Sequence, residues 1–95
     1  EPYSHLKKAA RVVAKKTGLA LSCYTTQVGM QFYTGNALGK KPVIGKGGKE
    51  FPRRGGFCLE TQFFPNAPAN PNFPQPELHM DEVWEAETVY KLDDL

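Results

Sequence analysis

Glycine and proline are concentrated in the middle of this chain, which limits how much regular structure it can form. The 95 residues include nine glycines and eight prolines, and all but Pro2 and Gly18 lie between Gly29 and Pro76. A small domain buries only a modest share of its surface, so this much irregular chain leaves few residues for a core. The composition, 40% hydrophobic and 23% charged, is nevertheless that of a globular protein rather than a disordered one.

The two cysteines, Cys23 and Cys58, can form at most one disulfide and cannot supply a disulfide framework. Both lie in apolar, strand-like stretches, which predicts reduced, buried thiols and a reducing, cytosolic compartment. Residues 1–5 lack the basic and apolar regions of a signal peptide. No apolar run approaches the roughly 18 residues of a membrane span, so no membrane association is expected.

The net charge of +2 hides an asymmetry along the chain. Before Glu50 the only acidic residue is Glu1, whereas from Glu77 onward there are seven acids and one base, Lys91. Segments of opposite charge usually meet in the fold, which argues against a nucleic-acid surface on the basic half.

The segment 6–17 has two possible interpretations. Leu6, Ala9 and Val13 recur at near-helical spacing, but Val12 and Val13 are β-branched and 15–18 is a turn signal. The next segment, 19–24, alternates between apolar and other residues as a half-buried strand does. We therefore predict two strands forming a hairpin around Gly18.

Further strands are predicted on either side of a long loop. Met30–Thr34 reads as a short strand, and 35–56 reads as a loop with six basic residues, seven glycines and two prolines. Phe57–Phe64 has the composition of a strong strand that stops at Pro65.

The C-terminal third completes an all-β pattern. Residues 65–76 hold five prolines and predict a rigid, extended loop. Leu78–Met80 and Val83–Leu92 predict a closing hairpin about Asp81 and Glu82. Short strands joined by long loops are typical of a β-sandwich or barrel, and no internal domain boundary is expected within 1–95.

Two glycine-rich segments invite functional interpretations that their details oppose. Gly45–Lys49 is similar to a phosphate-binding loop, but Gly39 is one residue too far upstream, Lys46 is followed by glycine and no helix pattern follows. Arg53–Phe57 is similar in composition to RNA-binding peptides, yet a loop that enters a core strand explains it more simply.

The sequence lacks the residue patterns that a metal site or an activated nucleophile requires. His5 and His79 are far apart, and neither cysteine belongs to a Cys-x-x-Cys pair, so no metal site is predicted. Neither histidine is placed to orient a serine or cysteine nucleophile.

Glu60 is the most informative carboxylate. On an extended strand it shares a face with Cys58 and Gln62, within the most apolar stretch of the chain. If it is buried there, it must be paired, hydrogen-bonded or raised in pKa, either as a structural ion pair or as a functional group. Gln31, a polar residue between Met30 and Phe32, has the same two possible roles, but the pattern around it is weaker.

Several segments, in order and at fitting intervals, resemble the galactose mutarotase (aldose 1-epimerase) family. They are Tyr24–Gln27, Gln31–Asn36, Gly45–Gly48, Gly56–Gln62, Asn70–Pro74 and Thr88–Tyr90. The resemblance runs over nearly the whole chain from about Ala10. It implies one large antiparallel β-sandwich, of which this chain is similar to the C-terminal part, and whose missing strands would complete the sparse core.

The resemblance also implies an activity without a cofactor. Members of the family interconvert the α and β anomers of galactose- and glucose-type aldoses by general acid–base ring opening and closure. The family's base falls on Glu60, and a glutamine that hydrogen-bonds the sugar falls on Gln31. The family's acid, a histidine, lies in an upstream motif that neither His5 nor His79 matches, so the N-terminal part of the enzyme is the expected partner. The alternative is a non-catalytic carbohydrate-binding fragment that lacks this acid.

Overall fold

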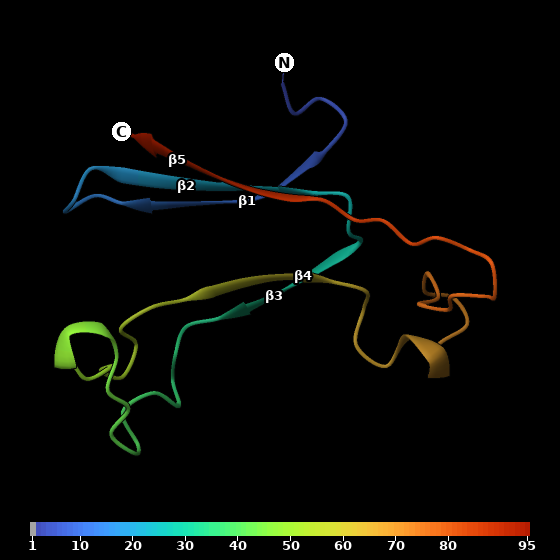
Figure 1. Ribbon diagram of the computed structural model, residues 1–95. Helices are drawn as coiled ribbons and strands as arrows, with labels where there is room; N and C mark the ends of the chain where they lie inside the picture. The colour runs from blue at the N-terminus through green and yellow to red at the C-terminus, as the bar shows by residue number, and fades with distance from the viewer. Residues whose placement is uncertain (1) are drawn as a thin grey trace. The chain divides into compact units, whose positions relative to one another are not determined.

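The computed structural model describes residues 2–95, and Glu1, the first residue of the predicted domain, lies outside them. The described chain is all-β, as predicted, and contains no α-helix (Figure 1). No helix within it is long or apolar enough to cross a membrane. Its elements are β1 (Lys7–Ala14), β2 (Leu19–Thr25), β3 (Gly29–Tyr33), the 3-10 turn η1 (Lys46–Gly48), β4 (Cys58–Gln62), η2 (Ala67–Ala69) and β5 (Thr88–Asp94).

The chain divides into two compact units. Unit 1 combines the residues up to Met30 with Thr61–Leu95, and unit 2 is Gln31–Glu60. Unit 1 contains a three-stranded sheet in the order β1-β2-β5. β3 and β4 pair with each other in a separate two-stranded sheet. The long loop that joins these two strands lies in unit 2.

The hairpin predicted around Gly18 is confirmed, and the helical interpretation of 6–17 is wrong. β1 and β2 pair antiparallel from Ala14↔Leu19 to Lys7↔Thr25, with an irregularity between Lys8 and Ala10. Gly18 adopts a φ of +75°, which an L-residue disfavours, and its N–H donates to the Ala14 carbonyl at 2.9 Å. The local turn chemistry therefore decides in favour of the strand over the near-helical spacing.

The predicted closing hairpin is wrong, because only its second half is a strand. The turn itself is present: Asp81 has a φ of +69° and the Glu82 N–H donates to the His79 carbonyl at 3.1 Å. However, β5 pairs antiparallel with β2, and its first residue, Thr88, lies opposite Thr25, the last residue of β2. Glu87 is still hydrogen-bonded to Thr25 and Thr26 at the end of β2. Residues 83–86 have no further β2 backbone to pair with, so they stay irregular.

The loop predicted as extended over 65–76 is instead folded back on itself. Asn66, with a φ of +58°, reverses the chain directly before η2, and Ala67 is buried. The Gln75 side-chain amide donates to the carbonyls of Ala67, Asn70 and Phe73 at 2.9–3.1 Å. A single glutamine thus closes a compact proline-rich loop.

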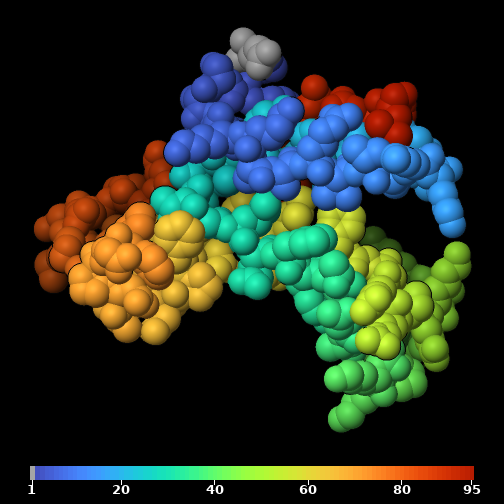
Figure 2. All heavy atoms as spheres, turned by 180° about the vertical axis from the view of Figure 1, so that it is seen from behind, coloured from blue at the N-terminus to red at the C-terminus, as the bar shows by residue number. Residues whose placement is uncertain are grey.

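The sheet of unit 1 has one distinctly apolar face. Directly paired residues share a face, so the register gathers on one side Ala10, Val12, Ala14, Leu19, Leu21, Cys23, Tyr90 and Leu92. Much of this face is uncovered, with Leu92 70% and Tyr90 54% exposed. Figure 2 shows the C-terminal residues in red beside the blue hairpin. The sparse core expected from the sequence is therefore observed.

The meeting of opposite charges expected from the sequence is limited. Within residues 2–95, one ion pair joins the N-terminal part to the acidic C-terminal part, between His5 Nε2 and Glu87 at 3.2 Å. Both side chains are more than half exposed, so the pair contributes little to stability.

The two cysteines are free thiols, but their environments differ. Cys23 is fully buried on the central strand, and burial raises the pKa of its thiol. Cys58 is exposed, so its predicted burial is wrong. β4 alternates, and it is Leu59 rather than Cys58 that points inward.

This difference predicts two separate thiol reactivities. Cys58 should react with a thiol reagent such as DTNB at once, and Cys23 on the order of a hundredfold more slowly, because it must wait for local opening. Time-resolved absorbance on the folded chain measures both phases. Cys58→Ser should remove the fast phase and Cys23→Ser the slow one. Two equally fast phases in the folded chain would contradict the buried position of Cys23.

Candidate active site

The two site residues predicted from the sequence occupy equivalent positions in neighbouring strands. Gln31 is the central residue of β3 and Glu60 is the central residue of β4, and these two strands form one sheet. The chain between them folds back at its base, where the Arg54 N–H donates to the Gly35 carbonyl at 3.0 Å. Adjacent strands lie about 5 Å apart, so central residues of paired strands are brought close together.

A ring contact indicates that both side chains lie on the same face. Phe32 and Phe57 meet edge to face with ring centroids 6.4 Å apart, so these two side chains share one side of the sheet. Side chains alternate along a strand, which places Gln31 on the side opposite to Phe32 and Glu60 on the side opposite to Phe57. Gln31 and Glu60 therefore share the remaining face.

Glu60 is exposed, so the expectation that a buried acid in this strand must be paired or hydrogen-bonded does not apply to it. The alternation of β4 turns Leu59, only 8% exposed, inward and leaves Cys58 and Glu60 outward. Within residues 2–95 the Glu60 carboxylate makes no hydrogen bond or ion pair. Both of its oxygens are thus available to accept a proton or a hydrogen bond from a ligand.

Gln31 is also exposed, and its side-chain amide has no hydrogen bond within the described residues. An amide can donate and accept at once, which suits it to a sugar hydroxyl that does the same. A carboxylate and an amide on one open face form a polar pair suited to binding hydroxyl groups and moving a proton between them.

The residue after Glu60 is anchored by threonine hydroxyls. Thr61 Oγ1 and Thr88 Oγ1 are 2.8 Å apart, and Thr88 Oγ1 and Thr25 Oγ1 are 3.0 Å apart. The Thr25 hydroxyl also donates to the Glu87 carbonyl at 3.1 Å and accepts from the Gln27 N–H. This threonine chain fixes the end of β4 that follows Glu60 against β2 and β5.

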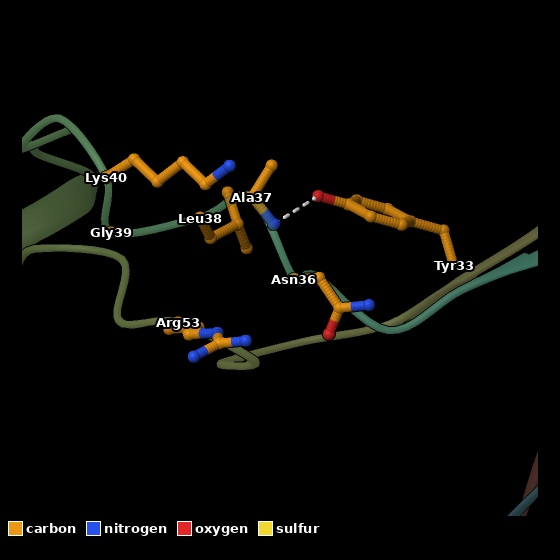
Figure 3. A pocket seen from close by; sticks show the side chains of 7 residues that line it. All are labelled: Tyr33, Asn36, Ala37, Leu38, Gly39, Lys40 and Arg53. Atoms are coloured by element: carbon orange, nitrogen blue, oxygen red, sulfur yellow. Dashed lines mark hydrogen bonds between the residues drawn. The ribbon is translucent and has the colours of Figure 1, made fainter.

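Beyond the end of β3 the loop of unit 2 forms an open hollow of about 420 Å³ (Figure 3). It is lined by Tyr33, Asn36, Ala37, Leu38, Gly39, Lys40 and Arg53. The Tyr33 hydroxyl accepts a hydrogen bond from the Ala37 N–H at 3.0 Å, and the Asn36 Oδ1 accepts from Arg54 Nε at 2.9 Å. Sequence reasoning treated 35–56 as a loop and missed this hollow. The only signal for it was the density of basic residues.

The glycine-rich segment 45–49 forms a tight turn rather than a phosphate-binding loop. The Gly45 N–H donates to the Lys49 carbonyl at 2.7 Å, and η1 covers three residues with no helix after it. Within residues 2–95, no group of three or more histidines, cysteines and acids is placed to hold a metal ion. His79 lies 3.7 Å from Glu77 at the surface.

Comparison with known proteins identifies the family. The aldose 1-epimerase family matches residues 2–91, and the chain belongs to that enzyme family. Galactose mutarotase of Bos taurus is 45% identical over 82 residues, which are 86% of this chain and 24% of that protein. The Homo sapiens protein gives the same values, and aldose 1-epimerase of Escherichia coli is 37% identical over 87 residues, 90% of this chain and 25% of that protein. The chain thus spans about a quarter of the length of these relatives.

The hydrogen-bonded threonines Thr25, Thr61 and Thr88 predict a stability effect that distinguishes the contribution of the Thr88 hydroxyl from that of its β-branched shape. Thr88→Val keeps the β-branched shape but removes both Oγ1 contacts, so the free energy of unfolding should fall by about 1–2 kcal/mol. Thr88→Ser keeps the hydroxyl and should cost less. Urea unfolding followed by circular dichroism measures both. An unchanged midpoint for Thr88→Val would show that the hydroxyls do not anchor β4.

Proposed function

We propose that this chain is part of an aldose 1-epimerase that interconverts the α and β anomers of galactose- and glucose-type sugars. The observation that supports it best is the exposed, unpaired carboxylate of Glu60 on the same face of the β3–β4 sheet as the Gln31 amide. Membership of the aldose 1-epimerase family supports the reaction class.

Glu60 acts as the general base in this proposal. Its carboxylate takes the proton of the anomeric hydroxyl while an acid protonates the ring oxygen, and the bond between the anomeric carbon and the ring oxygen breaks. The open-chain aldehyde then rotates about its bond to the next carbon and recloses on the other face, and both protons return. The base must lie within hydrogen-bond reach of the hydroxyl, about 2.6–3.2 Å.

Gln31 holds the sugar rather than transferring a proton, because an amide does not titrate in the relevant range. Its donor and acceptor atoms can bind a ring hydroxyl and orient the anomeric carbon toward Glu60. Fixing the sugar in this way lowers the entropic cost of reaching the transition state.

The remaining sugar ligands and the acid come from outside these 95 residues in this proposal. The chain covers about a quarter of its relatives, and the apolar face of the β1-β2-β5 sheet is uncovered. Burial of that face against the rest of the enzyme would supply apolar contact worth about 25 cal/mol per Å². We also propose a reducing, cytosolic location, which the two free thiols favour.

The base assignment is tested in a chimera. Residues 2–91 of this chain replace the matching segment of human galactose mutarotase, and polarimetry follows the approach of α-galactose to anomeric equilibrium. Glu60→Gln preserves shape and removes the proton acceptor, so kcat should fall about 10²- to 10⁴-fold. Glu50→Gln, the same change in the loop of unit 2, is the matched control and should leave kcat unaltered. Full activity of the Glu60→Gln chimera would exclude Glu60 as the base.

The role of Gln31 predicts a different kinetic signature in the same chimera. Gln31→Ala removes a neutral hydrogen-bonding partner, so KM for galactose should rise about five- to tenfold. Gln27→Ala, a substitution in the turn between β2 and β3, serves as the control. An unchanged kcat/KM for Gln31→Ala would show that this amide does not contact the sugar.

A further inference from the structure

We propose that the hollow in the loop of unit 2 is a binding site for a phosphate-type oxyanion. It is defined by the side chains of Tyr33, Asn36, Lys40 and Arg53 around a space of about 420 Å³. This volume is within the range of small-molecule sites.

The charge of unit 2 favours an anionic ligand. Between Gln31 and Glu60 there are six Lys and Arg residues against two carboxylates, Glu50 and Glu60. Within residues 2–95, none of these six cations forms an ion pair. The two that line the hollow, Lys40 and Arg53, are therefore not neutralised by any described carboxylate.

Each polar side chain that lines the hollow has a hydrogen left to donate. Lys40 and Arg53 carry only donors. The Asn36 Oδ1 is occupied by Arg54 Nε at 2.9 Å, which leaves the NH₂ group free. The Tyr33 oxygen accepts from the Ala37 N–H at 3.0 Å, which leaves the hydroxyl proton (Figure 3). A lining of donors matches a ligand of acceptors, which is the chemistry of phosphate oxygens.

The backbone of the hollow is held in place by close contacts. Gly39 has a φ of +84°, and a Cβ added there would lie 3.0 Å from the Arg53 backbone nitrogen. The Gly35 carbonyl accepts hydrogen bonds from the N–H groups of both Leu38 and Arg54, at 3.2 and 3.0 Å. These contacts keep the segments that carry Lys40 and Arg53 adjacent, so the two cations can act on one ligand.

Strand alternation links the hollow to the candidate sugar ligand. Tyr33 follows Gln31 by two residues in β3, so the two side chains leave the strand on the same side. The phosphate group could belong to an aldose phosphate or be free phosphate, and the experiment below distinguishes these two sources. The site does not depend on Glu60, so its test is independent of the proposed epimerase activity.

Isothermal titration of the 95-residue chain with inorganic phosphate, galactose 6-phosphate and galactose tests this site. We expect saturable binding of inorganic phosphate that Lys40→Gln and Arg53→Gln each weaken about tenfold, since each removes a charge-assisted hydrogen bond. Lys49→Gln removes the same charge from the same unit outside the hollow and should leave the affinity nearly unaltered. Circular dichroism verifies that each variant is folded.

Each outcome of the titration has one meaning. Tighter binding of galactose 6-phosphate than of phosphate or galactose supports the site with an aldose phosphate as ligand, and equal binding of the two phosphates supports it with free phosphate. Absence of saturable binding by both phosphates would overturn the proposal. Equal weakening by Lys49→Gln and Lys40→Gln would also overturn it, because the attraction would then be diffuse.

Discussion

Strand β2 is hydrogen-bonded on both of its edges, and unit 1 is organised around that fact. β1 pairs with one side and β5, from the far end of the chain, pairs with the other. Four of the eight buried residues among residues 2–95, Ala20, Ser22, Cys23 and Thr25, lie on β2. Central position in the sheet satisfies the backbone and excludes water from both edges, so this strand carries the core even though its neighbours remain open to solvent.

The uncovered apolar face explains why so few large side chains are buried. A sheet that is apolar on one side is stable when that side packs against another layer. Here the register collects most of the apolar residues of β1, β2 and β5 on one side, but Leu92 and Tyr90 are more than half exposed. A chain that spans a quarter of its relatives would lack most of the second layer of such a packing.

Local signals in the sequence predicted local structure well. The hairpin at Gly18 followed from a turn glycine between two alternating segments, and the turn at Asp81 was also in place. The strand with which a given segment pairs was not predictable from such local signals. Residues 83–87 alternate like a strand, but β2 ends at Thr25, so the β2–β5 ladder does not extend to them. Asn66 and Gln75 folded a proline-rich loop through contacts that composition does not reveal.

Only part of the candidate site could be proposed from the sequence. Glu60 and Gln31 came from the resemblance of short motifs, whereas the apolar neighbours of Glu60 suggested burial that alternation in β4 does not produce. The hollow beside Tyr33 depends on which residues of a long loop meet. No spacing rule connects Lys40 to Arg53, which are brought together by the backbone approach at Gly39.

Gln31 and Glu60 are the first and last residues of unit 2, so the loop between them begins and ends at the candidate sugar ligands. A sugar that contacts both would add a further link between β3 and β4, which already pair, and so would restrict fraying of these strands at the root of the loop. Linkage requires that such ordering and sugar affinity reinforce one another. Sugar binding would therefore change the mobility of loop residues between Gln31 and Glu60 that do not contact the sugar.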